Sequence, residues 1–173
     1  MSVSTYSKRS IWIHWLSALL ILATIPTGLA MSETEASPTK LLLYQLHFVI
    51  GMLVFFLAIF HVYVYFQDER PEKVDTGNAF RNKFVEILHR VLTILIFILT
   101  ITGVASLFTT HIWEAVQTGD ETLLSKSYPS LAVSMHHLQG IIFMFLCILH
   151  IIGIILHRFS KGKGILHRMG LKW

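Results

Sequence analysis

The chain has 173 residues, of which 54% are hydrophobic and 14% are charged, and its mean hydropathy is +0.63. This composition is too apolar for a soluble domain of this size and predicts an integral membrane protein. The formal net charge of +4 does not indicate nucleic acid as a partner, because membrane topology accounts for where the basic residues lie.

Four stretches without Asp, Glu, Lys or Arg are long enough to cross about 30 Å of hydrocarbon as helices. We expect the spans at approximately residues 10–31, 42–66, 86–108 and 133–157, in a single transmembrane domain that occupies residues 1–173. The loops between them are short, so the predicted fold class is an all-α, integral membrane four-helix bundle. In the longest outer loop, Gly119 and Asp120 mark a turn.

The basic residues predict the orientation of the bundle. Twelve of the fourteen Lys and Arg residues lie at the N-terminus, between the second and third spans, or at the C-terminus, and only Lys40 and Lys126 lie in the other two loops. The positive-inside rule therefore places both termini in the cytoplasm. The first and third spans then run outward, and the second and fourth run inward.

Every predicted span carries at least one histidine, a residue that is costly at membrane depth and usually marks a cofactor or an ion path. In chain order these histidines are His14, then His47 and His61, then His89, then His136, His137, His150 and His157. His136 and His150 are fourteen residues apart, which is roughly 21 Å along a helix and close to the same face. The fourth span thus has the geometry to hold two flat cofactors at different depths.

The predicted depths sort the histidines into pairs. His47 and His136 each begin an inward span and lie toward the outer face. His14 and His150 lie toward the inner face. A b-type haem needs two axial nitrogens from facing helices, so the two level pairs predict two haem iron sites. His61 is level with His150, and depth alone leaves it as the alternative to His14 as the inner ligand.

Small residues accompany the proposed outer ligands. Gly51 follows His47 by four residues and Gly140 follows His136 by four, so each glycine shares a helix face with its histidine. A glycine inside a helix costs about 1 kcal/mol relative to alanine, which calls for a reason such as a closely packed ring. The alternative is that these are ordinary small-residue helix contacts and that the histidines form interhelical hydrogen bonds.

His89 and Arg90 begin the third span on the inner side. We expect both to contribute to cofactor binding by contacting an inner haem propionate; the alternatives are an interfacial histidine and a snorkelling cation. The single cysteine, Cys147, excludes an intrachain disulfide and the attachment motif of a covalent haem, so a haem in this chain is b-type.

Two bis-histidine sites favour electron transfer over oxygen activation, because they leave the iron no open position. A metal or proton transporter is the competing class. Transporters usually carry intramembrane acids, which the charge-free stretches of these spans lack.

An ordered set of motifs runs along nearly the whole chain. It comprises Tyr6-Ser7 with His14-Trp15, His47 with Gly51, His89 with Gly103 fourteen residues later, His136 with His150 and His157, and a basic tail with Leu166-x-Arg168-Met169. Because it carries these motifs in this order, the chain resembles the bacterial cytochrome b561 family of four-helix, di-haem membrane cytochromes.

The resemblance implies two haem b groups, one ligated by His14 with His150 and one by His47 with His136. It also implies an oxidoreductase of the bacterial inner membrane that exchanges electrons with the membrane quinone pool, with a bound quinone as a further ligand. Expected partners are membrane lipid, quinone, and either a soluble redox donor or a second copy of the chain; nucleic acid is not expected.

The family also implies two alternative roles. Its members are similar in fold to the haem-bearing anchor subunits of larger redox complexes, and one member type is a superoxide oxidase that reduces ubiquinone. A surface that attracts superoxide is expected to be basic. The outer loops instead carry two lysines against five acidic residues, namely Glu33, Glu35, Glu114, Asp120 and Glu121.

Overall fold

The computed structural model describes residues 4–73, 75, 77–126, 130–161 and 164–171. Its long helices are α1 (Lys8–Glu33), α2 (Pro38–Gln67), α3 (Ala79–Phe108) and α6 (Leu131–Lys161), and its short helices are α4 (Ile112–Thr118), α5 (Thr122–Ser125) and α7 (Gly164–Arg168). The four long helices are long and apolar enough to cross a membrane, which confirms the predicted all-α membrane bundle. Each of them extends beyond the span expected from the sequence.

Helix starts follow from local chemistry. The side chains of Ser7, Ser37 and Asn78 cap α1, α2 and α3 by accepting hydrogen bonds from backbone N–H groups in the first turn. Pro38 occupies the first position of α2, where its missing N–H costs nothing. These caps lie outside the apolar spans, so the helices continue past the hydrocarbon core into the loops.

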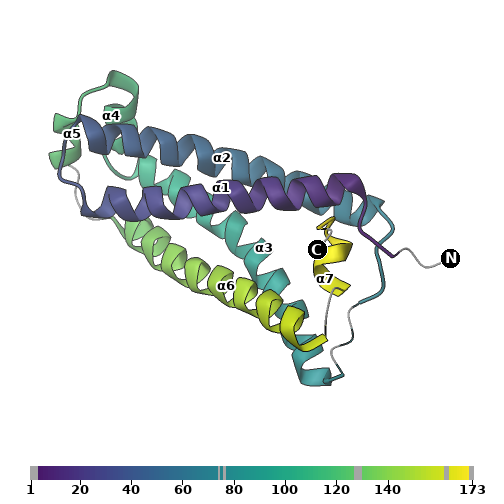
Figure 1. Cartoon of the computed structure of the whole chain (residues 1–173). Helices are drawn as coiled ribbons and strands as arrows, with labels where there is room; N and C mark the ends of the chain where they lie inside the picture. The colour runs from purple at the N-terminus through teal and green to yellow at the C-terminus, as the bar shows by residue number, and fades with distance from the viewer. Residues whose placement is uncertain (1–3, 74, 76, 127–129, 162–163, 172–173) are drawn as a thin grey trace.

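The bundle consists of two antiparallel hairpins. α1 packs along α2 and α3 packs along α6, whereas contacts between the hairpins are fewer and run mainly between α2 and α3 (Figure 1). We call the end that carries α4 and α5 the α4 end, and the opposite end, where α7 lies beside the start of α1, the α7 end (Figure 1). By the topology predicted above, the α4 end faces outward.

The best-packed apolar cluster lies at the α4 end, where α4 and α5 cover the hairpins; it is formed by Leu41, Leu107, Ile112, Ala115 and Leu124. Gly119 ends α4 in the left-handed conformation, with φ 74°, at the predicted turn. Along the spans, large apolar side chains face outward, as with Phe145, which is 62% exposed. In a membrane protein lipid covers such side chains, so the wide apolar exterior fits a bundle embedded in a bilayer.

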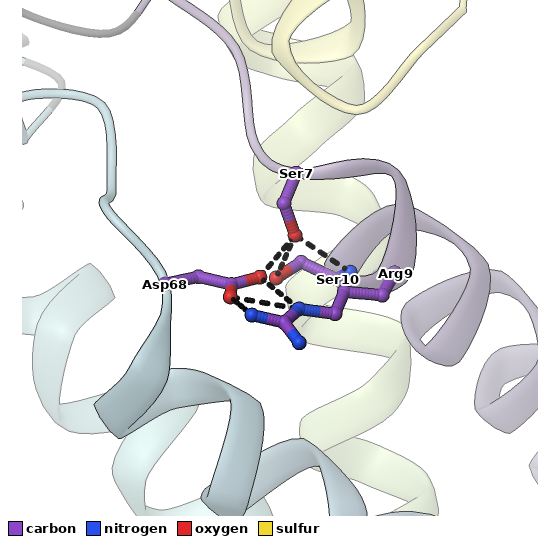
Figure 2. Close-up of polar contacts among 4 residues, drawn as sticks. All are labelled: Ser7, Arg9, Ser10 and Asp68. Carbon is purple, nitrogen blue, oxygen red and sulfur yellow. Dashed lines mark hydrogen bonds and ion pairs between the residues drawn. The ribbon is translucent and has the colours of Figure 1, made fainter.

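Polar contacts close the α7 end. Figure 2 shows Asp68, just after α2, accepting hydrogen bonds from Ser7 and from the Arg9 guanidinium at the start of α1. The guanidinium and the hydroxyl hold the pKa of the Asp68 carboxyl below its ordinary value of 3.8. These contacts tie the two helices of the first hairpin together outside the apolar spans.

The segment around α7 is bonded to the beginning of the chain. The Tyr6 N–H donates to the Arg168 carbonyl at 3.2 Å, and the Trp15 indole Nε1–H donates to the Met169 carbonyl at 3.0 Å. The C-terminal segment therefore lies against α1, at the end of the bundle where His14 begins its span.

Candidate functional site

His47 of α2 and His136 of α6 face each other toward the α4 end. Their ring centroids are 6.0 Å apart and their ring planes meet at 88°. Both side chains are half-buried, and each belongs to a different hairpin. The space between the hairpins is thus spanned by one imidazole from each side, as the matched depths predict.

His14 of α1 and His150 of α6 form the second facing pair, toward the α7 end. Their ring centroids are 6.4 Å apart and their planes meet at 63°. The structure therefore brings together both pairs that the sequence placed at equal depth. Their role as ligands stays a prediction.

The spacing within each pair fits an iron atom between the two rings. A metal–imidazole bond of about 2.0–2.1 Å, with about 1.1 Å from Nε2 to the ring centroid, gives roughly 6.3 Å between the centroids of two axial imidazoles. The two observed spacings, 6.0 and 6.4 Å, lie close to this value. The ring centroids of His89 and His150 are only 4.8 Å apart, which is too close for an iron atom between the two rings.

Hydrogen bonds fix the tautomers of the pair at the α4 end. Nδ1 of His47 lies 3.2 Å from the Thr24 carbonyl, and Nδ1 of His136 lies 2.9 Å from the Leu99 carbonyl. A carbonyl can only accept, so Nδ1 carries the hydrogen in both rings. Nε2 is then left with its lone pair, which is the arrangement of a neutral imidazole ready to bind a metal.

Two threonine hydroxyls add to these contacts. Thr27 Oγ1 lies 3.2 Å from Nδ1 of His47, and Thr102 Oγ1 lies 3.3 Å from Nδ1 of His136. The glycines that follow these threonines make the close approach possible. A Cβ on Gly28 would lie 3.0 Å from Cε1 of His47, and a Cβ on Gly103 would lie 2.9 Å from Cε1 of His136.

The pair at the α4 end opens into a cavity of about 470 Å³ between the hairpins, lined mostly by apolar side chains and within the range of small-molecule and cofactor sites. Gly51 and Gly140 line this cavity, and a Cβ on either would meet no atom within 4 Å. Both glycines thus border open space beside their histidines, as a flat ring packed between the helices requires.

The α7 end gathers further histidines around the second pair. His89 is exposed, donates from Nδ1 to the Val85 carbonyl at 2.7 Å, and stands perpendicular to the ring of His150. His61 is half-buried and lies near His14 and His89. His61 therefore stays an alternative ligand at this level, and the propionate role of His89 stays a prediction.

Arg90 is engaged within its own helix. Its guanidinium forms an ion pair with Glu86 one turn earlier, and Lys73 approaches the same carboxylate at 3.2 Å. The expected contact of Arg90 with a propionate stays a prediction, and it would have to compete with this pairing.

The sequence reasoning missed the residues that hold the rings at the α4 end. Thr27 with Gly28 in α1 and Thr102 with Gly103 in α3 belong to two copies of a Thr-Gly-x-Ala motif. Each copy lies in the long helix that precedes the one carrying the contacted histidine. This recurrence is the sequence signal that could have revealed these residues. The missed contacts are the ones that decide which way each imidazole points.

A family model for prokaryotic cytochrome b561 matches residues 5–171, nearly the whole chain. No curated protein matches the sequence. The matched range includes both facing histidine pairs and all four long helices. The chain therefore belongs to the prokaryotic cytochrome b561 family, whose members are membrane proteins that bind b-type haem and transfer electrons.

Proposed function

We propose that this chain carries electrons across the membrane through two b-type haems and exchanges them with the membrane quinone pool. The proposal rests on one observation: two pairs of imidazoles face each other at two levels of the bundle, and the centroid spacing in each pair fits two ligands of one iron atom. His47 with His136 would hold the haem at the α4 end, and His14 with His150 the haem at the α7 end.

The protein supplies ligands, space and a dry surrounding. The bound haems supply reversible one-electron redox chemistry. At the α4 end, His47 and His136 carry their hydrogen on Nδ1 and leave Nε2 free to bind iron, while Gly51 and Gly140 leave room beside them and the apolar lining restricts water. Two histidines at each haem would leave oxygen no open position, which favours electron transfer.

The two sites lie in series along α6. His136 and His150 are fourteen residues apart, which corresponds to roughly 21 Å of helix rise. With both termini in the cytoplasm, as the positive-inside rule predicts, the α4 site lies toward the outer face of the inner membrane and the α7 site toward the cytoplasm. We do not propose superoxide oxidation, because the outer loops carry more acidic than basic residues.

A reduced-minus-oxidised absorption spectrum of the purified protein, with haem quantified per chain, tests the proposal. We expect a b-type α-band and two haems per chain. H136A is expected to lose the haem at the α4 end and H150A the haem at the α7 end. H137A, one residue away on the same helix and lining the same cavity, is the matched control and retains both. A colourless wild-type protein, or one haem per chain, contradicts the proposal.

Two further measurements address the open assignments. H14A and H61A are compared for the haem at the α7 end; loss in H61A but not in H14A would reassign that ligand. Adding a quinol to the oxidised protein in detergent tests exchange with the pool, and reduction of the haems is the expected result. A wild-type protein with two haems that no quinol reduces and no quinone oxidises would refute the quinone link.

A further inference from the structure

The two hairpins repeat one arrangement of residues. In α2, His47 is followed by Gly51 and then by His61, and α6 has the same spacing from His136 through Gly140 to His150. The preceding helices match as well, with His14 and the Thr-Gly-x-Ala motif in α1 and His89 and the same motif in α3, again at equal spacing. The chain is therefore an internal repeat of a two-helix unit.

At the α4 end the repeat produces two equivalent half-sites. In each hairpin the first helix supplies a carbonyl, a threonine and a glycine, and the second helix supplies the histidine. The threonine–histidine distances agree closely, at 3.2 Å for Thr27 with His47 and 3.3 Å for Thr102 with His136. The same contact formed twice, from two separate sequence segments, indicates that it contributes to the site.

Each threonine hydroxyl is arranged to accept from the imidazole. Thr27 Oγ1 donates its single hydrogen to the Thr24 carbonyl at 2.8 Å. Thr102 Oγ1 has the Gln139 side-chain oxygen at 2.9 Å as an acceptor. With the hydroxyl hydrogen used in this way, the threonine oxygen keeps a lone pair that can accept from the histidine Nδ1–H. That N–H is then shared between the hydroxyl and the neighbouring carbonyl.

We propose that Thr27 and Thr102 are positioning residues for the haem at the α4 end. Each accepts a hydrogen bond from the Nδ1–H of one axial histidine, holds the two imidazole planes near perpendicular, and strengthens the rings as electron donors. The inference rests on the proposed ligand role of His47 and His136. A stronger donor favours ferric iron, so these threonines lower the reduction potential of this haem.

Another threonine provides a matched control. Thr100 is half-buried and lines the same cavity, two residues before Thr102 on α3. Its hydroxyl bonds to the Ile96 carbonyl one turn earlier on the same helix, at 2.9 Å. A change from Thr to Val at any of the three positions removes one hydroxyl at nearly constant volume, but only T27V and T102V remove a contact with an imidazole.

The experiment compares haem content, midpoint potential and the ferric low-spin EPR spectrum of T27V, T102V and T100V in the haem-loaded protein. In T27V and T102V we expect the midpoint potential of the α4-end haem to rise by roughly 30 to 60 mV, which is a threefold to tenfold shift of its one-electron reduction equilibrium. Its EPR g-anisotropy should fall as the ring planes leave the perpendicular. T27S and T102S should restore both values, and T100V should match the wild type.

The outcomes separate this inference from the proposed function. A wild-type protein without the α4-end haem refutes the ligand assignment itself. If that haem is present and T27V and T102V equal T100V in potential and EPR, the positioning role is refuted. Should T27V and T102V lose the haem altogether, full haem content in T27S, T102S and T100V supports the role, and loss in the serine variants contradicts it.

Discussion

Replacing Gly103 by alanine tests the proposed ligand geometry with a single methyl group. The added Cβ would lie 2.9 Å from Cε1 and 3.2 Å from Nδ1 of His136, whereas ordinary contacts begin near 3.4 Å. The ring therefore has to move away from α3 by about half an ångström. That movement stretches the bond from Nδ1 to the Leu99 carbonyl, now 2.9 Å, toward the limit of hydrogen bonding.

The magnitude follows from three terms. Weakening one hydrogen bond costs about 0.5–1.5 kcal/mol, and crowding a packed contact costs about 1–3 kcal/mol, while alanine restores about 1 kcal/mol of helix propensity. The fold is thus expected to survive at a net cost of about 0.5–3.5 kcal/mol. The clash falls on the proposed ligand, so affinity for the α4-end haem should drop by roughly tenfold or more, and affinity for the α7-end haem should not change.

The assay is haemin titration of the apoprotein in detergent, with the two sites distinguished by their spectra. G153A is the control, because Gly153 lies on α6 as well but toward the α7 end, and a Cβ there meets no atom within 4 Å. If G103A binds the α4-end haem as tightly as the wild type and G153A do, His136 is not held against α3 as a ligand and the reasoning fails.

Three further predictions follow from the same structure. The perpendicular ring planes at the α4 end, 88° against 63° at the α7 end, predict a more anisotropic ferric EPR signal from the α4-end haem, and equal signals would contradict this. D68N should lower the unfolding temperature at neutral pH. The lowered pKa of Asp68 makes its contribution present above the ordinary value of 3.8 and lost as the pH falls below it, so wild type and D68N should converge in acid; a constant gap refutes the prediction. W15F should weaken the docking of α7 by about 1 kcal/mol and speed hydrogen exchange in residues 166–171, whereas W12F, at an exposed neighbouring position, should not.

The fold and the histidine pairs could be predicted because both follow from one-dimensional properties. Charge-free length fixes where helices can cross a bilayer, and the distribution of lysine and arginine predicts their direction. Depth within a span is then a matter of counting residues. His47 thus falls level with His136, and His14 level with His150, before any packing is known, with His61 at that second level as the alternative to His14.

The contacts around the rings could not be predicted in the same way. Whether Thr27 reaches His47 depends on how far α1 is rotated about its axis and how closely it packs on α2. Neither quantity is set by hydropathy, since large apolar side chains face outward on every long helix. Arg90 shows the opposite case, because its partner Glu86 stands four residues earlier and the spacing alone could have indicated a pair along the helix, although we expected Arg90 at a haem propionate.

A high-resolution density map of the haem-loaded protein tests the central claim most directly. We predict two macrocycles, one with its iron between His47 and His136 and one with its iron between His14 and His150. A map in which these imidazoles contact only neighbouring backbone or water, with no macrocycle between the rings of either pair, would contradict the account.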